Sequence, residues 1–285
     1  MDVAKVAVIG AGTMGNGIAQ VFAVSGLDVL MTDVNDAAAQ RGVAAIAKSL
    51  DRLLARQKIS EVEKTGTLAR IRTSTRLDEV AGCDVIVEAA TENVDLKLKI
   101  FADLDHIAKP SAILASNTSS ISLTRIAGST KRPAQVIGMH FFNPVPLMQL
   151  VELIRALQTS DATFEVVKAL TQKVGKTPVE VKNSPGFVAN RILLPMLNEA
   201  VFCLSERLAS AEDIDTVMKL GMAHPMGPLA LADLIGLDTC LSILEVLYDG
   251  FKDPKYRPCP LWREKVEAGH LGRKTGHGFF DYAER

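Results

Sequence analysis

A histidine and a glutamate, twelve residues apart, are the side chains of this sequence best suited to moving a proton. His140 follows the apolar run 136–139, which is typical of a buried strand, and Glu152 lies inside a second such run at 150–154. Histidine titrates near neutral pH, so His140 could accept the proton of a hydroxyl group while a hydride leaves the adjacent carbon. A carboxylate among apolar neighbours needs a partner, and His140 could be that partner. Each residue also has a plainer interpretation: a structural histidine at a strand end, and a glutamate that faces solvent from an edge strand.

A glycine-rich loop near the N-terminus is the second chemical signature. It follows the apolar run 6–9, opens a predicted helix, and consists of Gly10, Ala11, Gly12, Thr13, Met14 and Gly15. In such a unit the first glycine permits a tight turn, the second lets the backbone approach a pyrophosphate, and the third allows close packing of the helix on the sheet. Free N–H groups and the helix dipole favour the phosphate charge. The pattern predicts a dinucleotide site.

Asp33 ends the second predicted strand, 18 residues beyond Gly15. An acid at that place can accept hydrogen bonds from both ribose hydroxyls of an adenosine. Its charge would repel a 2′-phosphate, and the next two residues, Val34 and Asn35, supply no arginine to offset it. We therefore expect NAD rather than NADP as the cofactor. The alternative is a glycine-rich turn beside a solvated aspartate.

The first two thirds of the chain alternate strand-like and amphipathic segments, which predicts parallel βαβ units in a Rossmann-type α/β fold. We expect strands at 6–9, 27–32, 84–88, 113–116, 136–139 and 150–154, and helices at 18–25, 36–57, 96–107 and 163–174. Gly26 should end the first helix and Asn35 should cap the second. These elements predict a mostly parallel sheet that is covered on both faces.

The pattern becomes helical after Ser184-Pro185-Gly186. We expect helices at 188–206, 211–219, 229–248 and 261–268. The predicted domains are therefore 1–184, which binds NAD, and 185–285, which is all-helical. Polar side chains gather in three later segments, 116–120, 138–144 and 183–191, and the first two follow predicted strands, where ligands of open α/β sheets bind.

Composition excludes several classes of protein. A net charge of −1 argues against nucleic-acid binding, and no apolar run approaches the roughly 18 residues of a membrane span. A cleavable leader is rejected because its removal would discard the glycine loop. The four cysteines and five histidines match no metal-binding spacing, so we expect no metal and a reduced, cytoplasmic protein.

Several longer runs resemble the L-3-hydroxyacyl-CoA dehydrogenase family, in the family's order and over essentially the whole chain. They are GAGTMGNGIAQ, EAATEN, ASNTSSIS, GMHFFNPVPLMQLVE, SPGFVANRI, HPMGPLALAD and GRKTGHGFFDY. The resemblance implies reversible NAD-dependent oxidation of a short-chain (S)-3-hydroxyacyl-CoA, such as (S)-3-hydroxybutyryl-CoA, to the 3-oxo compound. It also implies a homodimer that is formed through the helical domain.

The resemblance assigns catalytic roles to four residues. His140 is the base in oxidation and the acid in reduction, Glu152 is its charge partner, and Ser119 and Asn190 bind the reacting oxygen and the thioester region. A donor beside the 3-oxo group would stabilise the charge that develops there. The plainer alternatives are a helix N-cap for Ser119 and an interhelical hydrogen bond for Asn190.

Binding residues are carried over in the same way. Beside the glycine loop and Asp33, the expected cofactor contacts are Glu92, Lys97, Ser119, Asn143 and Lys274. The expected CoA contacts are Ser49 and Arg56, with Arg52 and Lys58 nearby, and with Ser119 and Asn190 at the acyl end. Alternatively, Glu92 and Lys97 form a solvated pair at a helix start, and the basic residues are an ordinary exposed helix face.

Two other functions fit the same residues. One is a dehydrogenase of a non-CoA hydroxy acid on this scaffold. The other is a non-catalytic NAD-binding protein, against which the joint presence of Ser119, His140, Glu152 and Asn190 argues.

Overall fold

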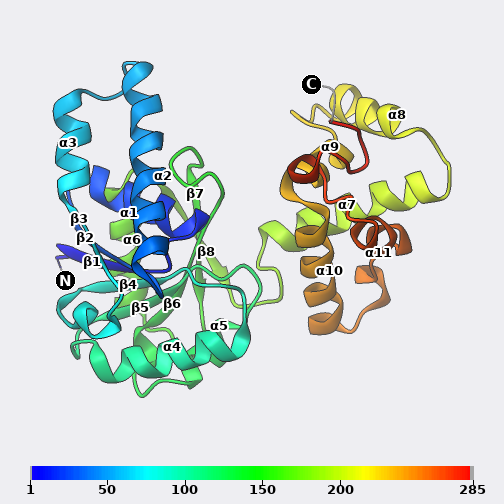
Figure 1. Cartoon of the computed structure of the whole chain (residues 1–285). Helices are drawn as coiled ribbons and strands as arrows, with labels where there is room; N and C mark the ends of the chain where they lie inside the picture. The colour runs from blue at the N-terminus through cyan, green and yellow to red at the C-terminus, as the bar shows by residue number, and fades with distance from the viewer. Residues whose placement is uncertain (1, 283–285) are drawn as a thin grey trace. The chain divides into compact units, whose positions relative to one another are not determined.

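The computed structural model of the chain describes residues 2–282 and divides the chain into two compact units between Asn183 and Ser184 (Figure 1). The first unit is built on one eight-stranded sheet with the strand order β3-β2-β1-β4-β5-β6-β7-β8. The strands are β1 (Lys5–Ile9), β2 (Asp28–Thr32), β3 (Ile71–Ser74), β4 (Val85–Glu88), β5 (Ile113–Ser116), β6 (Val136–Phe141), β7 (Leu150–Arg155) and β8 (Thr177–Lys182). Neighbouring strands are parallel except at β6 and β7, which pair antiparallel. The predicted mostly parallel sheet is confirmed.

Helices cover both faces of this sheet (Figure 1). They are α1 (Thr13–Val24), α2 (Asp36–Ala55), α3 (Glu61–Ala69), α4 (Val94–Ile107), α5 (Leu123–Gly128) and α6 (Asp161–Lys173). Strand side chains alternate between the two faces, so Val8 and Val87 join the core that also holds Phe22 of α1. The alternate residue Ile86 is equally buried on the other face. Burial on both faces explains why the central strands read as continuous apolar runs.

Helix ends follow the expected chemistry. The Asn35 side chain accepts a hydrogen bond from the backbone N–H of Ala38 at 2.8 Å, which confirms the predicted cap of α2. Gly26 follows α1 with φ +86°, a conformation that glycine adopts without strain. Ser60 and Glu63 form a reciprocal capping box at the start of α3.

Two α-helices and two strands of the first unit were not predicted: α3, α5, β3 and β8. The sequence of β8, TPVEVK, contains a proline and alternating polar residues, because β8 is an edge strand that is largely exposed. Strand β3 has four residues and none of them is fully buried. Neither segment therefore shows the apolar run that marks a central strand.

The second unit is helical. Its helices are α7 (Ala189–Ser205), α8 (Ala211–Thr216), α9 (Pro228–Ile235), α10 (Leu237–Phe251) and α11 (Pro260–Glu267), and a π-helical turn, Val217–Gly221, follows α8. Its core surrounds the fully buried Trp262. The Asn198 side-chain oxygen accepts hydrogen bonds from the Trp262 indole at 3.0 Å and from the Cys259 N–H at 2.9 Å, and so fixes α7 to α11.

The prediction of one helix over 229–248 is wrong, because α9 ends at Ile235 and α10 begins at Leu237. Between them Gly236 has φ +106°, which breaks the helical backbone. The apolar spacing continues across the break, so the periodicity alone could not reveal it.

Within the described residues no helix is both long and apolar enough to cross a membrane. The same residues hold no cluster of three or more His, Cys, Asp or Glu side chains that could bind a metal ion.

Replacing Gly236 by alanine should destabilise the helical unit by about 1 to 3 kcal/mol, the usual cost of forcing a side chain into such a backbone conformation. The new Cβ would also lie 3.1 Å from Asp238 Oδ1 and 3.2 Å from Lys274 Nζ. Urea unfolding followed by the fluorescence of the single tryptophan, Trp262, reports on this unit. Gly221→Ala is the matched control, because its Cβ meets no atom within 4 Å. Equal unfolding midpoints for the two variants would contradict the assignment of strain to Gly236.

Candidate functional site

The glycine loop joins the carboxyl end of β1 to the N-terminus of α1, as predicted. Gly10 has φ +101°, and its N–H donates to the Thr32 carbonyl at 2.7 Å, which ties the loop to β2. A Cβ at Gly15 would clash with the Gly10 carbonyl oxygen, whereas a Cβ at Gly12 would meet nothing within 4 Å. Gly12 therefore keeps open the space in front of the N–H groups of α1, where a pyrophosphate would lie.

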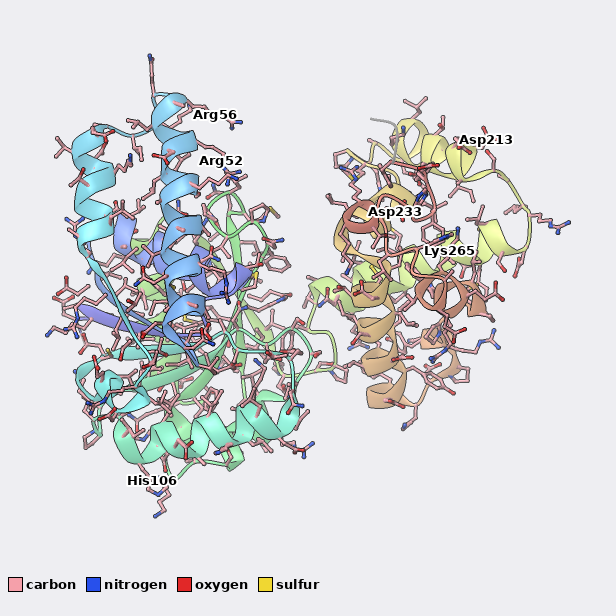
Figure 2. The ribbon with its side chains drawn as sticks, in the orientation of Figure 1. Arg52, Arg56, His106, Asp213, Asp233 and Lys265 are labelled. Atoms are coloured by element: carbon pink, nitrogen blue, oxygen red, sulfur yellow. The ribbon has the colours of Figure 1, made fainter. Side chains whose placement is uncertain are left out.

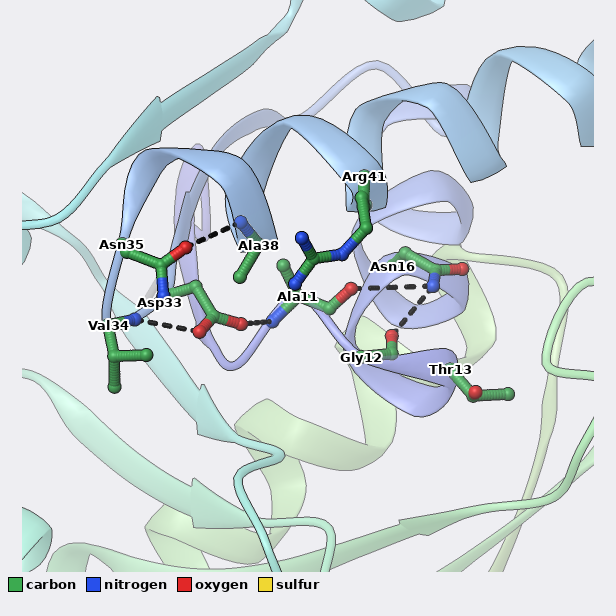
Figure 3. Close-up of a pocket in the computed structure, with 10 residues that line it drawn as sticks. Ala11, Gly12, Thr13, Asn16, Asp33, Val34, Asn35, Ala38 and Arg41 are labelled. Atoms are coloured by element: carbon green, nitrogen blue, oxygen red, sulfur yellow. Dashed lines mark hydrogen bonds between the residues drawn. The ribbon is translucent and has the colours of Figure 1, made fainter.

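Asp33 follows β2 and fixes the same loop. One oxygen of its carboxylate accepts from the Ala11 N–H at 2.7 Å and the other from the Val34 N–H at 2.7 Å. A cavity of about 460 Å³ opens beside it (Figure 3). Its lining residues are Ala11, Gly12, Thr13, Asn16, Asp33, Val34, Asn35, Ala38, Arg41 and Gly42. A loop of backbone donors next to a fixed carboxylate fits a dinucleotide with a free ribose.

Arg41 lines this cavity and was not predicted. It lies on α2, three residues after Ala38, so both side chains project from the same face of the helix. The two residues directly after Asp33 in the sequence contain no arginine, whereas Arg41 comes eight residues after it. The helical spacing from Asn35 was the signal that could have found Arg41.

A buried ion pair lies where β4 and β5 end. Lys97 of α4 donates to Glu88 at 2.6 Å, and the two side chains are 1% and 0% exposed. The other Glu88 oxygen accepts from the Ser116 hydroxyl at 2.6 Å. The interpretation of Lys97 as a solvated residue is therefore wrong. Glu88 was missed, because it stands at the end of an apolar run and its partner comes from a different element.

Glu92 connects Lys97 to the segment that carries Ser119. One of its oxygens lies 3.3 Å from Lys97 Nζ, and the other accepts from the Ser119 N–H at 3.0 Å and the Ser120 N–H at 3.1 Å. Burial would raise the pKa of Glu92, but the charge of Lys97 and hydrogen bonds from Thr118, Ser120 and Ser119 lower it. Glu92 is thus held as a carboxylate, which fixes the Ser119 backbone.

Ser119 itself lies in the bend that follows β5. The alternative role of Ser119 as a helix N-cap is wrong, because Ser122 caps α5 by accepting from the Arg125 N–H. Ser119 is half-buried.

His140 and Glu152 lie directly opposite each other on β6 and β7. His140 Nδ1 is 2.8 Å from Glu152 Oε2, and the side chains are 8% and 2% exposed. Strand β6 continues one residue past His140, and β8 pairs with the far side of β7. The interpretation of Glu152 as a solvent-facing residue of an edge strand is therefore wrong. When Nδ1–H donates to the carboxylate, the imidazole carries its acceptor lone pair on Nε2, as a general base requires.

The loop between β6 and β7 carries Asn143, which is exposed. Lys176 fixes this loop, because its ammonium donates to the carbonyls of Val145 at 2.8 Å and Met148 at 2.6 Å. Burial lowers the pKa of Lys176. Asn117 connects β5 to β6, because its side-chain oxygen accepts from the Phe141 N–H at 2.9 Å. Asn117 lies in the predicted polar segment 116–120, but neither its role nor that of Lys176 was predicted, because their partners are backbone atoms of other elements.

Arg52 and Arg56 lie at the C-terminal end of α2, where both side chains are exposed (Figure 2). Ser49 is half-buried on the same helix. Spacings of three and four residues put Ser49, Arg52 and Arg56 along one helix face. This face is separate from the cavity beside Asp33, which takes its lining from the first turns of α2.

Asn190 and Lys274 belong to the helical unit. Asn190 is the second residue of α7, and its backbone N–H donates to the Gly186 carbonyl at 3.1 Å. The Lys274 ammonium contacts both oxygens of Asp238, at 2.6 and 2.7 Å. The ion pair joins the segment after α11 to the start of α10.

Comparison with known proteins identifies the family. Residues 5–184 match the 3-hydroxyacyl-CoA dehydrogenase NAD binding domain, and residues 186–282 match the C-terminal domain of the same family. The chain is 55% identical to a probable 3-hydroxybutyryl-CoA dehydrogenase of Bacillus subtilis, over 100% of this chain and 99% of that protein. It is 54% identical to 3-hydroxybutyryl-CoA dehydrogenase of Bradyrhizobium diazoefficiens, over 98% of this chain and 95% of the relative.

A solved structure agrees. The crystal structure of (S)-3-hydroxybutyryl-CoA dehydrogenase from Ralstonia eutropha superposes with a TM-score of 0.96 at 59% identity, covering 99% of this chain and 100% of that one. Both domains of the family are thus present in this chain. The chain belongs to the 3-hydroxyacyl-CoA dehydrogenase family and is an NAD-dependent oxidoreductase whose residues 5–184 form the NAD-binding domain.

Proposed function

We propose that this protein catalyses the reversible oxidation of (S)-3-hydroxybutyryl-CoA to acetoacetyl-CoA with NAD. The observation that carries the proposal is the buried His140–Glu152 pair in a unit that matches an NAD-binding domain. Relatives that are 54–59% identical along nearly the whole chain bear the name of this activity.

His140 is the proton acceptor in oxidation. The substrate loses a proton from its 3-hydroxyl group and a hydride from the same carbon, and NAD supplies the acceptor for that hydride. His140 Nε2 takes the hydroxyl proton, and the Glu152 carboxylate at Nδ1 stabilises the imidazolium that results. In the reverse direction the same imidazolium returns the proton to the 3-oxo group. A carboxylate that fixes the tautomer and orientation of the base avoids reorganisation during the reaction.

Ser119 and Asn190 bind the substrate in this proposal, with Ser119 donating to the reacting oxygen and Asn190 to the thioester region. The charge-fixed Glu92 supports the Ser119 role, because it holds the backbone N–H groups on both sides of that hydroxyl. Glu88 and Lys97 act as positioning residues through Glu92, since full burial leaves Lys97 little surface for direct contact.

Cofactor contacts come from the glycine loop and Asp33, with Glu92, Ser119 and Asn143 toward the nicotinamide. Lys274 belongs to this group through the family resemblance. Lys97 acts on the cofactor site through its positive charge, which holds Glu92 in place. Ser49 and Arg56 bind the CoA nucleotide, because an exposed guanidinium suits its phosphates. These assignments divide α2 into an inner end for the dinucleotide and an outer end for CoA.

The protein works as a homodimer in the cytoplasm in this proposal. The helical unit exposes large apolar side chains, among them Ile192, Leu220 and Met222, and such surface is typical of a subunit interface. All four cysteines are free thiols, as expected in a reducing compartment.

We expect fast oxidation of NADH with acetoacetyl-CoA and slow reaction with free acetoacetate. Only acetoacetyl-CoA carries the CoA phosphates that Arg56 would bind. Replacing NADH by NADPH should also slow the reaction, because Asp33 repels a 2′-phosphate. Initial rates from NADH absorbance measure both effects. Equal rates with acetoacetyl-CoA and acetoacetate would point to a non-CoA hydroxy acid as the substrate.

His140→Gln should lower turnover of acetoacetyl-CoA by roughly a hundredfold or more, the scale of general acid–base catalysis. NADH binding, measured by fluorescence titration, should stay near that of the wild type. His106→Gln is the matched control, because His106 is an exposed residue of α4 (Figure 2). Undiminished turnover in His140→Gln would remove His140 from the mechanism.

Glu92→Ala should lower turnover by roughly 10- to 100-fold, because the Ser119 segment loses the acceptor of two backbone N–H groups and a small displacement of a reacting group is costly. Glu92→Gln keeps an acceptor oxygen and should retain most of the activity. Steady-state kinetics of both variants with acetoacetyl-CoA and NADH make the comparison. If the two variants lose activity equally, the charge of Glu92 matters rather than its grip on the loop.

A further inference from the structure

The cavity beside Asp33 is lined by one positively charged side chain, Arg41, which has no role in the proposed function. Asp33 and Arg41 are the two charged residues among the ten that line it. Asp33 is held in place by the N–H groups of Ala11 and Val34. Arg41 is exposed, and its guanidinium forms no ion pair with any residue between 2 and 282. Its donors are therefore available to a ligand in the cavity.

The position of Arg41 is set by α2 rather than by the strand. Asn35 caps the helix, so Ala38 and Arg41 follow one another on the face that looks onto the glycine loop. Figure 3 shows the Arg41 side chain reaching from the helix toward Ala11 and the Asp33 carboxylate. Asp33 marks where the adenosine ribose would bind. A planar guanidinium with five donors in that region matches the geometry of a phosphate group.

We propose that Arg41 is a second determinant of cofactor choice, a phosphate-binding residue whose reach includes the ribose 2′-position. The Asp33 carboxylate suppresses this capacity in the native protein. The repulsion between the carboxylate and a 2′-phosphate outweighs the attraction between Arg41 and that phosphate. The preference for NAD is thus a balance of two opposite charges in one cavity. Removing the negative charge alone should expose the affinity of Arg41 for a 2′-phosphate.

Direct binding separates the two contributions without reference to turnover. Purified protein is titrated with NADH and with NADPH, and cofactor fluorescence gives both Kd values. Asp33→Asn keeps an oxygen that can accept from the Ala11 N–H, so the loop is retained while the charge is lost. Its ratio of the NADPH Kd to the NADH Kd should fall roughly tenfold or more, the scale of one charge-assisted hydrogen bond.

Adding Arg41→Gln to Asp33→Asn should restore most of the wild-type ratio. Arg70→Gln in the Asp33→Asn background is the control, because Arg70 is an exposed arginine of the same unit that does not line the cavity. Fluorescence of bound NADH in every variant verifies that the site is folded. A ratio that falls equally with and without Arg41 would overturn the proposal, as would an unchanged ratio in Asp33→Asn. Neither result would bear on the catalytic role of His140, because no turnover is measured.

Discussion

The reversal of strand direction between β6 and β7 is the constraint on which the pairing of His140 with Glu152 depends. The connection between them spans only residues 142–149, whereas a parallel neighbour would need a crossover of about a dozen residues or more. The short loop therefore forces antiparallel pairing. In that register His140 meets Glu152 directly across the ladder, with both side chains on one face. Two positions twelve residues apart thus become a buried pair in direct side-chain contact.

The remaining strand ends are tied together by side chains instead of by the ladder. Glu88 ends β4 and Ser116 ends β5, and the Glu88 carboxylate accepts from the Ser116 hydroxyl on one oxygen and from Lys97 of α4 on the other. A fully buried charge is tolerated only when it is paired and hydrogen-bonded, so these three residues must adopt one arrangement. Through Glu92 the same charge reaches the Ser119 segment. His140 is thus positioned by the strand ladder, whereas the Ser119 segment is positioned by side-chain contacts.

Local signals were enough to predict much of this fold. The glycine loop, Asp33 and the Asn35 cap are short-range patterns, and the central strands are apolar because both of their faces are buried. Edge strand β8 and the Gly236 break left no such pattern, since one is exposed and the other sits within continuous apolar spacing. Glu88 and Arg41 were missed for another reason: each is defined by a partner or a cavity that only the folded chain brings near. The pairing of Glu152 with His140 was predictable because a carboxylate within an apolar run demands a partner.

Glu92 also has a consequence for how this protein can evolve. A single carboxylate oxygen collects donors from three successive residues, Thr118, Ser119 and Ser120. Loss of the acceptor would strand several donors at once, and loss of a hydroxyl would leave the carboxylate less solvated beside Lys97. Substitutions at these positions are therefore expected to be inherited together. A lineage that alters the chemistry of this segment would therefore be expected to change position 92 as well.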